Sequence, residues 1–262
     1  MNNNPFEEHG VKYLSPTAFN KFAKDPAKWL VNIAGYKDRF FSAPMSFGIV
    51  IETGITHGCM TDASINECID AAMEEYVRLH KEIKELDAPY NWEACNKKQK
   101  QVAETLTQVI PQYRALGHPI AAQEWVEFSL PDFPIPIRGK VDMLYEDCVR
   151  DIKTTGYAVK PKADYDRQLT FYAYATDRAP KLDYVYVTTK KVELISQDVK
   201  NVNKHFNDIK RITDKMMRML SLSSDINEVA YLSCLEPNIT NEDFYNQWGA
   251  NEIVGAKKMF NL

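Results

Sequence analysis

The stretch GKVDMLYEDCVRDIKTT, residues 139–155, decides the fold that the sequence predicts. Two short apolar runs lie on either side of a Glu-Asp pair, as expected for two strands joined by a two-residue turn. Asp142, Asp151 and Lys153 interrupt these runs where a buried strand normally carries an aliphatic side chain. A chemical reason for the three charges is therefore needed.

The register of this hairpin places two of the charges opposite each other. Opposed residues of an antiparallel hairpin keep a constant sum of residue numbers, which is 293 if the turn pairs Tyr145 with Cys148. Asp142 and Asp151 give the same sum, so they share one face with Cβ atoms about 4.5–5.5 Å apart. Lys153 lies on that face too. A slip of one residue would place the two aspartates on opposite faces.

Two opposed carboxylates are destabilising unless a cation lies between them. The Asp142 and Asp151 carboxylates, helped by the Ile152 carbonyl, suit magnesium or manganese. Lys153 could orient or help deprotonate a water, or neutralise charge that develops on a phosphate. An Asp-x-Lys pair alone is most often a solvated ion pair, and it is the facing Asp142, after Gly139, that favours the catalytic interpretation.

The composition narrows the class of protein. The chain has 262 residues, 45% of them hydrophobic and 26% charged, which is ordinary for a globular protein that buries a core. A net charge of −4 argues against a nucleic-acid coat protein but allows an enzyme with a local binding groove. No apolar run approaches the roughly 20 residues of a membrane span, and the N-terminus is polar. We expect a cytoplasmic protein without a membrane partner.

The periodicity of apolar residues predicts an α/β fold with helices first and a sheet second. Helices are expected at residues 14–34, 45–58, 63–86, 92–116, 164–177 and 198–221. Pro111 is expected to kink or shorten one of them. Strands are expected at residues 124–130, 137–145, 148–154, 182–190 and 191–199. We predict a single domain over 1–262, with a mainly helical part at 1–120, a catalytic sheet core at 121–195 and a helical part at 196–262.

Four motifs, in order over roughly residues 13–190, resemble the PD-(D/E)XK nuclease superfamily and most of all its RecB-type branch, which includes phage exonucleases. LSPTAFNKFAKDPAKWL (14–30) resembles the opening helix, and FGIVIE (47–52) resembles the Gly-x-x-x-His helix. Residues 139–155 resemble the core Gly-x-x-Asp and Asp-x-Lys-Thr motifs, and QLTFY (168–172) resembles the Gln-x-x-x-Tyr helix. The resemblance implies a restriction-endonuclease-like core, with a mixed and mainly antiparallel sheet flanked by helices.

The resemblance also implies roles for further residues. Glu52 stands where the RecB-type pattern has histidine, so we expect it to be a metal ligand, with a solvated glutamate as the alternative. Gln168 and Tyr172 share one helix face and are expected to contact substrate, unless Tyr172 belongs to the core and Gln168 is solvated. Lys140, opposite Lys153 in the predicted register, and Thr154 are also expected to contact substrate.

Many relatives carry an iron–sulfur cluster held by one N-terminal and three C-terminal cysteines. The N-terminal ligand there belongs to a Cys-Pro pair, whereas this chain has Asp25 and Pro26. Its C-terminal region has only Cys234, and the five cysteines include no Cys-x-x-Cys pair. We therefore predict magnesium or manganese as the cofactor and no iron–sulfur cluster.

These features predict a metal-dependent DNA nuclease, more specifically an exonuclease in which a metal-activated water attacks the phosphodiester. Structure-selective endonuclease activity, or a catalytically silent nucleic-acid-binding module, are the alternatives. Basic residues after the core and along 200–218 could contact a duplex end or a single strand, or could be a solvated surface. By resemblance to phage enzymes, a recombination or annealing protein and further copies of the chain are expected as partners in a phage or bacterial cytoplasm.

Overall fold

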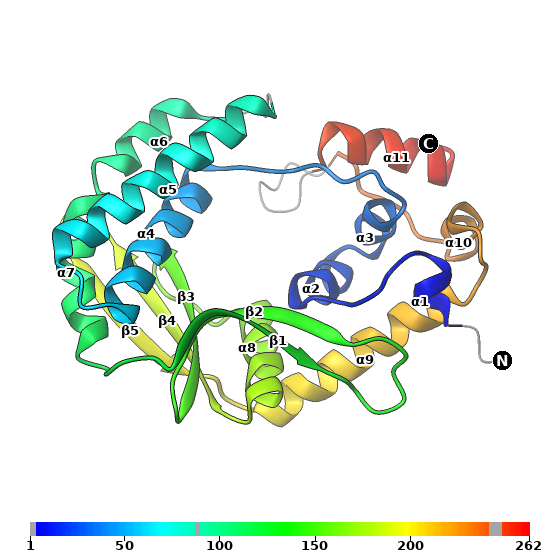
Figure 1. Cartoon of the computed structure of the whole chain (residues 1–262). Coiled ribbons are helices and arrows are strands. Elements are labelled where there is room, and N and C mark those ends of the chain that lie inside the picture. Colours follow the sequence, from blue (N-terminus) through cyan, green and yellow to red (C-terminus); the bar gives the residue numbers. More distant parts are fainter. Residues whose placement is uncertain (1–3, 87–89, 241–247) are drawn as a thin grey trace. The chain divides into compact units, whose positions relative to one another are not determined.

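The computed structural model describes residues 4–86, 90–240 and 248–262. The chain forms two compact units, each assembled from separate segments (Figure 1). Unit 1 comprises residues 1–39, 127–139 and 201–262, and unit 2 comprises residues 40–126 and 140–200. The sequence suggested three consecutive parts of one domain, and the single-domain organisation stays a prediction.

A mixed sheet of five strands, in the order β1-β2-β3-β4-β5, confirms the predicted fold class. β2 pairs antiparallel with β3, β3 pairs parallel with β4, and β4 pairs antiparallel with β5. The parallel connection between β3 and β4 contains a helix, as such crossovers usually do. The strands are β1 (Ala121–Phe128), β2 (Ile137–Leu144), β3 (Cys148–Thr155), β4 (Ala179–Val187) and β5 (Val192–Asp198).

The hairpin of β2 and β3 has the predicted register at its turn. Met143 pairs with Arg150, and the Tyr145 N–H donates to the Cys148 carbonyl at 2.8 Å. Both pairs give the predicted sum of residue numbers, so the turn contains two residues as expected. Because a strand alternates its faces with a period of two, this register fixes the side of the hairpin on which the charged residues lie.

The helices of unit 2 flank this sheet. α4 packs against β3 and α7 against β5, while α8 packs against β3 and β4 (Figure 1). The apolar side of α4 is buried, with Phe47, Val50 and Ile51 in the core. A Cβ at Gly54 would lie 2.5 Å from a Leu106 methyl, so glycine allows α4 to approach α7 closely. The helices are α4 (Ala43–Met60), α5 (Ile65–Glu85), α6 (Trp92–Gln99), α7 (Val102–Arg114) and α8 (Ala163–Thr176).

Unit 1 gathers helices from both ends of the chain. Leu14 forms a parallel bridge with Ile137, so the N-terminal segment is held against residues 127–139. α3 packs against α11, where the buried Glu252 carboxylate accepts from Asn32 at 2.7 Å and pairs with Lys28 at 3.0 Å. The helices are α1 (Pro5–Glu8), α2 (Pro16–Lys24), α3 (Pro26–Ile33), α9 (Val202–Leu220), α10 (Ile226–Leu232) and α11 (Ala250–Phe260).

Two helices that the sequence predicted as continuous are split. The predicted helix 14–34 breaks at Asp25, whose side chain accepts from the Lys28 N–H at 2.9 Å and begins α3 in front of Pro26. The predicted helix 92–116 breaks between α6 and α7. Pro111 lies inside α7, which continues to Arg114, so this proline does not end the helix. α10 and α11 were not predicted, and residues 241–247 of the same tail lie outside the described residues.

Candidate active site

The two aspartates of the hairpin belong to unit 2, with Asp142 on β2 and Asp151 on β3. Asp142 Oδ2 accepts a hydrogen bond from the Ile152 N–H at 2.7 Å. Asp142 is the residue before Met143, which pairs with Arg150. Asp151 is 1% exposed and lies in the middle of β3. Burial of two carboxyl groups at this point is costly unless each is paired or neutralised.

Lys153 provides the nearest positive charge. Its ammonium group forms an ion pair with Asp151 Oδ2, and it lies 5.4 Å from the centre of the Tyr165 ring. Burial alone would lower the pKa of Lys153, but the carboxylates of Asp151 and Asp142 outweigh burial and raise it above the ordinary value. In this arrangement Lys153 is therefore protonated at neutral pH.

The carboxyl groups of Asp142 and Glu52 have raised pKa values. For Asp142 the largest cause is burial, followed by the negative charges of Asp151 and Glu52. Burial is also the largest cause for Glu52, where Lys153 and a hydrogen bond from Gln123 act in the opposite direction. The carboxyl groups of Glu52, Asp142 and Asp151 thus outnumber the ammonium groups of Lys153 and Lys140 around them, which favours uptake of a proton or another cation.

Gln168 and Tyr172 of α8 lie on one helix face, as the sequence predicted, and connect β2 to β3. The Gln168 amide donates to Asp151 Oδ1 at 3.0 Å and to the Tyr172 hydroxyl at 3.1 Å. The Tyr172 hydroxyl donates to the Lys140 carbonyl at 2.8 Å. Tyr172 is 3% exposed, so it belongs to the core and to this network at once. Both side chains orient Asp151, and their contact with substrate stays a prediction.

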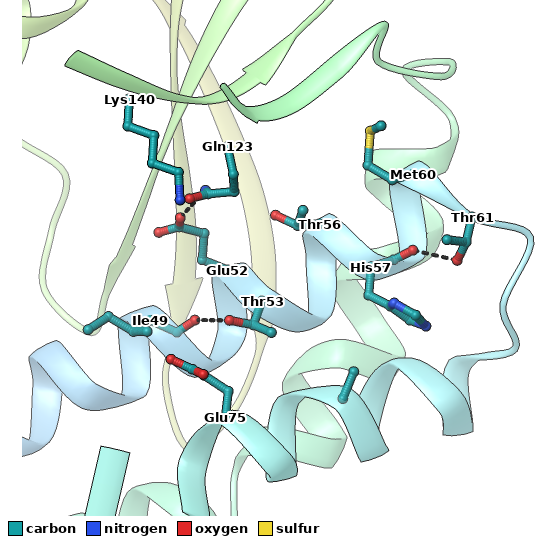
Figure 2. Close-up of a pocket in the computed structure, with 11 residues that line it drawn as sticks. Ile49, Glu52, Thr53, Thr56, His57, Met60, Thr61, Glu75, Gln123 and Lys140 are labelled. Carbon is teal, nitrogen blue, oxygen red and sulfur yellow. Dashed lines mark hydrogen bonds between the residues drawn. The ribbon is translucent and has the colours of Figure 1, made fainter. Parts of the chain in front are cut away.

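Glu52 approaches the site from α4, and its partner is a residue that the sequence did not single out. Gln123 on β1 donates to Glu52 Oε1 at 2.5 Å, and Figure 2 shows Gln123 and Lys140 directed towards Glu52. Gln123 has a φ of 55°, which a residue with a side chain adopts at a cost of about 1–3 kcal/mol. Strand periodicity assigns such a residue no special backbone conformation, so the sequence contained no signal for it.

Thr154 and Lys140 lie at the edge of the same group. The Thr154 hydroxyl is buried and has no hydrogen-bond partner among the described residues. Its Cβ lies 3.9 Å from the point where Gly48 of α4 would carry a side chain. Lys140 is exposed on β2 and lines a hollow between α4, α5 and the sheet, next to Glu52. Substrate contact at either residue stays a prediction.

The donors around Asp142 fit a hard divalent cation. Asp142, Asp151 and Glu52 supply carboxylate oxygens and Ile152 a carbonyl, and a cation would relieve the repulsion that raises the pKa of Asp142. Within the described ranges, no three His, Cys, Asp or Glu side chains are already gathered as a ligand set. Asp151 pairs with Lys153, and Glu52 accepts from Gln123 through Oε1.

The basic residues that follow the core are partly paired with acids of the same chain. Lys181 pairs with Asp198 at 2.5 Å, and Arg211 on α9 pairs with Asp208 at 2.9 Å. The Arg178 guanidinium donates to the Tyr145 carbonyl at 2.8 Å. Some of these basic side chains are therefore held by ion pairs or hydrogen bonds within the protein. The contact of these residues with nucleic acid stays a prediction.

The model of the PD-(D/E)XK nuclease superfamily matches residues 13–234, which is most of the chain. The chain belongs to the PD-(D/E)XK nuclease superfamily. Members of this superfamily typically use divalent metal ions, and a nuclease acts on nucleic acid. The match confirms the resemblance that the four sequence motifs indicated.

One solved structure shows the same fold. A protein from Eubacterium rectale named "Putative exonuclease" aligns with a TM-score of 0.58 and 12% identity, over 84% of this chain and 86% of that chain. The protein SSO0001 aligns over 85% of this chain and 95% of its own, with 15% identity and a TM-score of 0.32. No curated protein matches the chain. None of the helices in the described segments is long and apolar enough to cross a membrane.

Proposed function

We propose that this member of the nuclease superfamily is a metal-dependent DNA exonuclease. The observation that supports the proposal is the placement of Asp142, Asp151 and Lys153 on the β2–β3 hairpin. Asp142 accepts from the Ile152 N–H, between Asp151 and Lys153 in the chain, while Asp151 pairs with Lys153 and accepts from Gln168. A catalytically silent module of the same fold would have no need for buried carboxylates that destabilise it. The name of the Eubacterium rectale protein supports exonuclease activity by fold likeness alone.

Each residue of the group has a chemical role in this proposal. Asp142, Asp151, Glu52 and the Ile152 carbonyl would hold magnesium or manganese, and when bound the cation would activate a water and polarise the phosphate. The protonated Lys153 would neutralise charge that develops on the phosphate and orient the attacking water. Gln168 and Tyr172 would keep Asp151 in place while its ion pair with Lys153 is exchanged. No iron–sulfur cluster has a role in this mechanism.

Cleavage of labelled DNA by matched variants tests the site. Asp151→Asn removes the charge of the central ligand, and we expect it to reduce the cleavage rate by roughly a hundredfold or more. Asp147→Asn removes the same charge from the exposed turn of the same hairpin and should cleave at the wild-type rate. Equal rates for wild type and Asp151→Asn would contradict the assignment, and failure of the wild-type protein to cut any DNA with magnesium or manganese would contradict the function.

The form of the substrate separates an exonuclease from a structure-selective endonuclease. An exonuclease releases nucleotides from linear DNA and leaves a covalently closed circle intact. We expect this result, with release that starts at one labelled end. Cleavage of the closed circle or of branched substrates at internal positions would instead favour the endonuclease. In the cell, the proposed activity would process DNA ends in the cytoplasm during recombination, repair or phage replication, beside an annealing protein.

A further inference from the structure

Tyr165 lies on the first turn of α8, three residues before Gln168. Residues three apart share one side of a helix, so both side chains can reach the same region of the sheet. Gln168 donates to Asp151 at 3.0 Å, and the centre of the Tyr165 ring lies 5.4 Å from the Lys153 ammonium group. One side of α8 therefore contacts both members of the ion pair that Asp151 forms with Lys153.

The contact between Tyr165 and Lys153 is a cation–π interaction. A cation within about 6 Å of the ring centre is attracted by the negative face of the ring, and more strongly where water is excluded. The Lys153 side chain is 25% exposed and Tyr165 is half-buried, so part of this contact is shielded from solvent. The ring therefore gives the ammonium group a second partner besides Asp151.

The two partners of Lys153 differ in charge. Asp151 is the central metal ligand of the proposed function, and a carboxylate that is neutralised by another cation attracts an ammonium group less. The Tyr165 ring carries no net charge, so its attraction for Lys153 does not depend on the charge at Asp151. The ring is thus the contact that keeps Lys153 in place when its pairing with Asp151 weakens.

The hydroxyl of Tyr165 bonds to a different lysine. Lys162, an exposed residue immediately before α8, approaches the same ring to 4.9 Å and donates to the Tyr165 hydroxyl at 3.5 Å. Lys153 lies over the ring itself. Loss of the hydroxyl should therefore leave the contact with Lys153 intact, whereas loss of the ring should remove it.

We propose that Tyr165 is a positioning residue of the nuclease, whose aromatic ring holds the Lys153 ammonium group beside the phosphodiester that is cut. The proposal rests on the proposed function, because that function assigns Lys153 its role in the reaction. Tyr165 acts through Lys153 and does not itself bind the DNA. The electron density of the ring face, rather than the hydroxyl, then determines how well Lys153 is placed.

Variants that separate the ring from the hydroxyl test this role in cleavage of labelled DNA. Tyr165→Phe keeps the ring and should cleave within about threefold of wild type. Tyr165→Leu removes the ring, and we expect kcat to fall by about tenfold to a hundredfold with KM unchanged, because Lys153 is displaced. Phenylalanine analogues with increasing numbers of fluorine atoms at position 165 keep a similar shape and weaken the negative ring face, so kcat should fall stepwise.

Tyr36 provides the matched control for the fluorinated series. It is a half-buried tyrosine of unit 1, with the Lys258 ammonium group 5.9 Å from its ring centre. The same analogues at position 36 should leave kcat at the wild-type value. A kcat that does not follow fluorination at position 165, in variants whose folding is checked by circular dichroism, would overturn the proposal. A rise in KM with kcat unchanged would overturn it as well, since that result assigns the ring to DNA binding.

The placement of Lys153 can be measured without DNA or metal, by NMR of the full chain labelled with carbon-13 at lysine Cε. The signal that disappears in Lys153→Met identifies the Lys153 resonance. We expect the ring current of Tyr165 to shift this resonance, so Tyr165→Leu should move it and Tyr165→Phe should leave it near its wild-type position. Identical Lys153 resonances in wild type and Tyr165→Leu would overturn the proposal. If the expected shifts occur but the wild-type protein cuts no DNA, the contact stands and the proposed function fails.

Discussion

The carboxyl group of Asp142 is buried beside two other carboxyl groups, and its pKa is raised by burial and by their charges. The folded state therefore holds the proton at a pH where the unfolded chain, with a pKa of about 3.9, has released it. The stability that this proton uptake contributes is fully present below the unfolded pKa and is lost as the pH rises through the folded pKa. Without metal, the fold should weaken as the pH rises through this window.

The Asp142→Asn variant tests this charge effect. The amide oxygen can still accept from the Ile152 N–H, but the side chain no longer ionises. In EDTA, we expect the variant to melt above wild type at alkaline pH, by roughly 2–4 °C for each kcal/mol recovered, and close to wild type near a pH of about 4. Thermal unfolding across a pH series is the measurement. Parallel melting curves of the two proteins at every pH would contradict the account.

Gln123 holds Glu52 from a strained backbone position, so its backbone and its amide can be tested separately. Gln123→Gly relieves the left-handed conformation but removes the hydrogen bond, and each effect is worth about 1 kcal/mol. We expect little change in unfolding free energy and a cleavage rate lower by about tenfold to a hundredfold. Gln123→Asn tolerates the same φ with a shorter amide and should lose activity as well. Full activity in both variants would exclude a positioning role.

At the scale of elements, α4 carries Glu52 to the sheet, and its position depends on close packing against α7. A Cβ at Gly54 would lie 2.5 Å from a Leu106 methyl and 3.2 Å from a backbone oxygen of α5. Gly54→Ala should therefore displace the helix and lower the unfolding free energy by about 1–3 kcal/mol.

Gly48 of the same helix is the matched control for Gly54. A Cβ at Gly48 would meet only the Thr154 side chain at 3.9 Å, which is ordinary contact. Gly48→Ala should therefore gain up to about 1 kcal/mol from helix propensity. Chemical denaturation measures the free energy of unfolding of both variants. Equal values would show that the close approach of α4 to α7 does not affect stability.

The hairpin could be predicted from sequence because a two-residue turn and the period of two fix the register once the turn is identified. The start of α2 has a regular sequence pattern as well, since Ser15 precedes Pro16 and its hydroxyl accepts from the Ala18 N–H at 3.1 Å. Gln123 could not be predicted, because its partner is distant in sequence and its backbone is unusual for a strand. α11 was missed because its buried contacts include glycine and glutamate, which give no clear apolar period.

At the scale of the whole molecule, a net charge of −4 means that nucleic acid must be bound through a few local cations. Lys140 is exposed at the hollow beside Glu52, whereas Lys181 pairs with Asp198. Lys140→Gln should weaken DNA binding and reduce the slope of log affinity against log salt by about 1. Lys181→Gln should leave that slope unchanged. Binding isotherms at several salt concentrations measure it, and identical slopes for Lys140→Gln and wild type would remove Lys140 from the DNA contact.

The central claim is that the carboxylates of the β2–β3 hairpin form a metal-dependent centre for DNA hydrolysis. The most direct measurement is the rate of nucleotide release from end-labelled linear DNA as magnesium or manganese is titrated, for wild type and Asp142→Asn. The account predicts no release in EDTA, a saturable rise with metal for wild type, and a maximal rate lower by roughly a hundredfold or more in the variant. Release that needs no metal, or an equal response of both proteins, would contradict the claim.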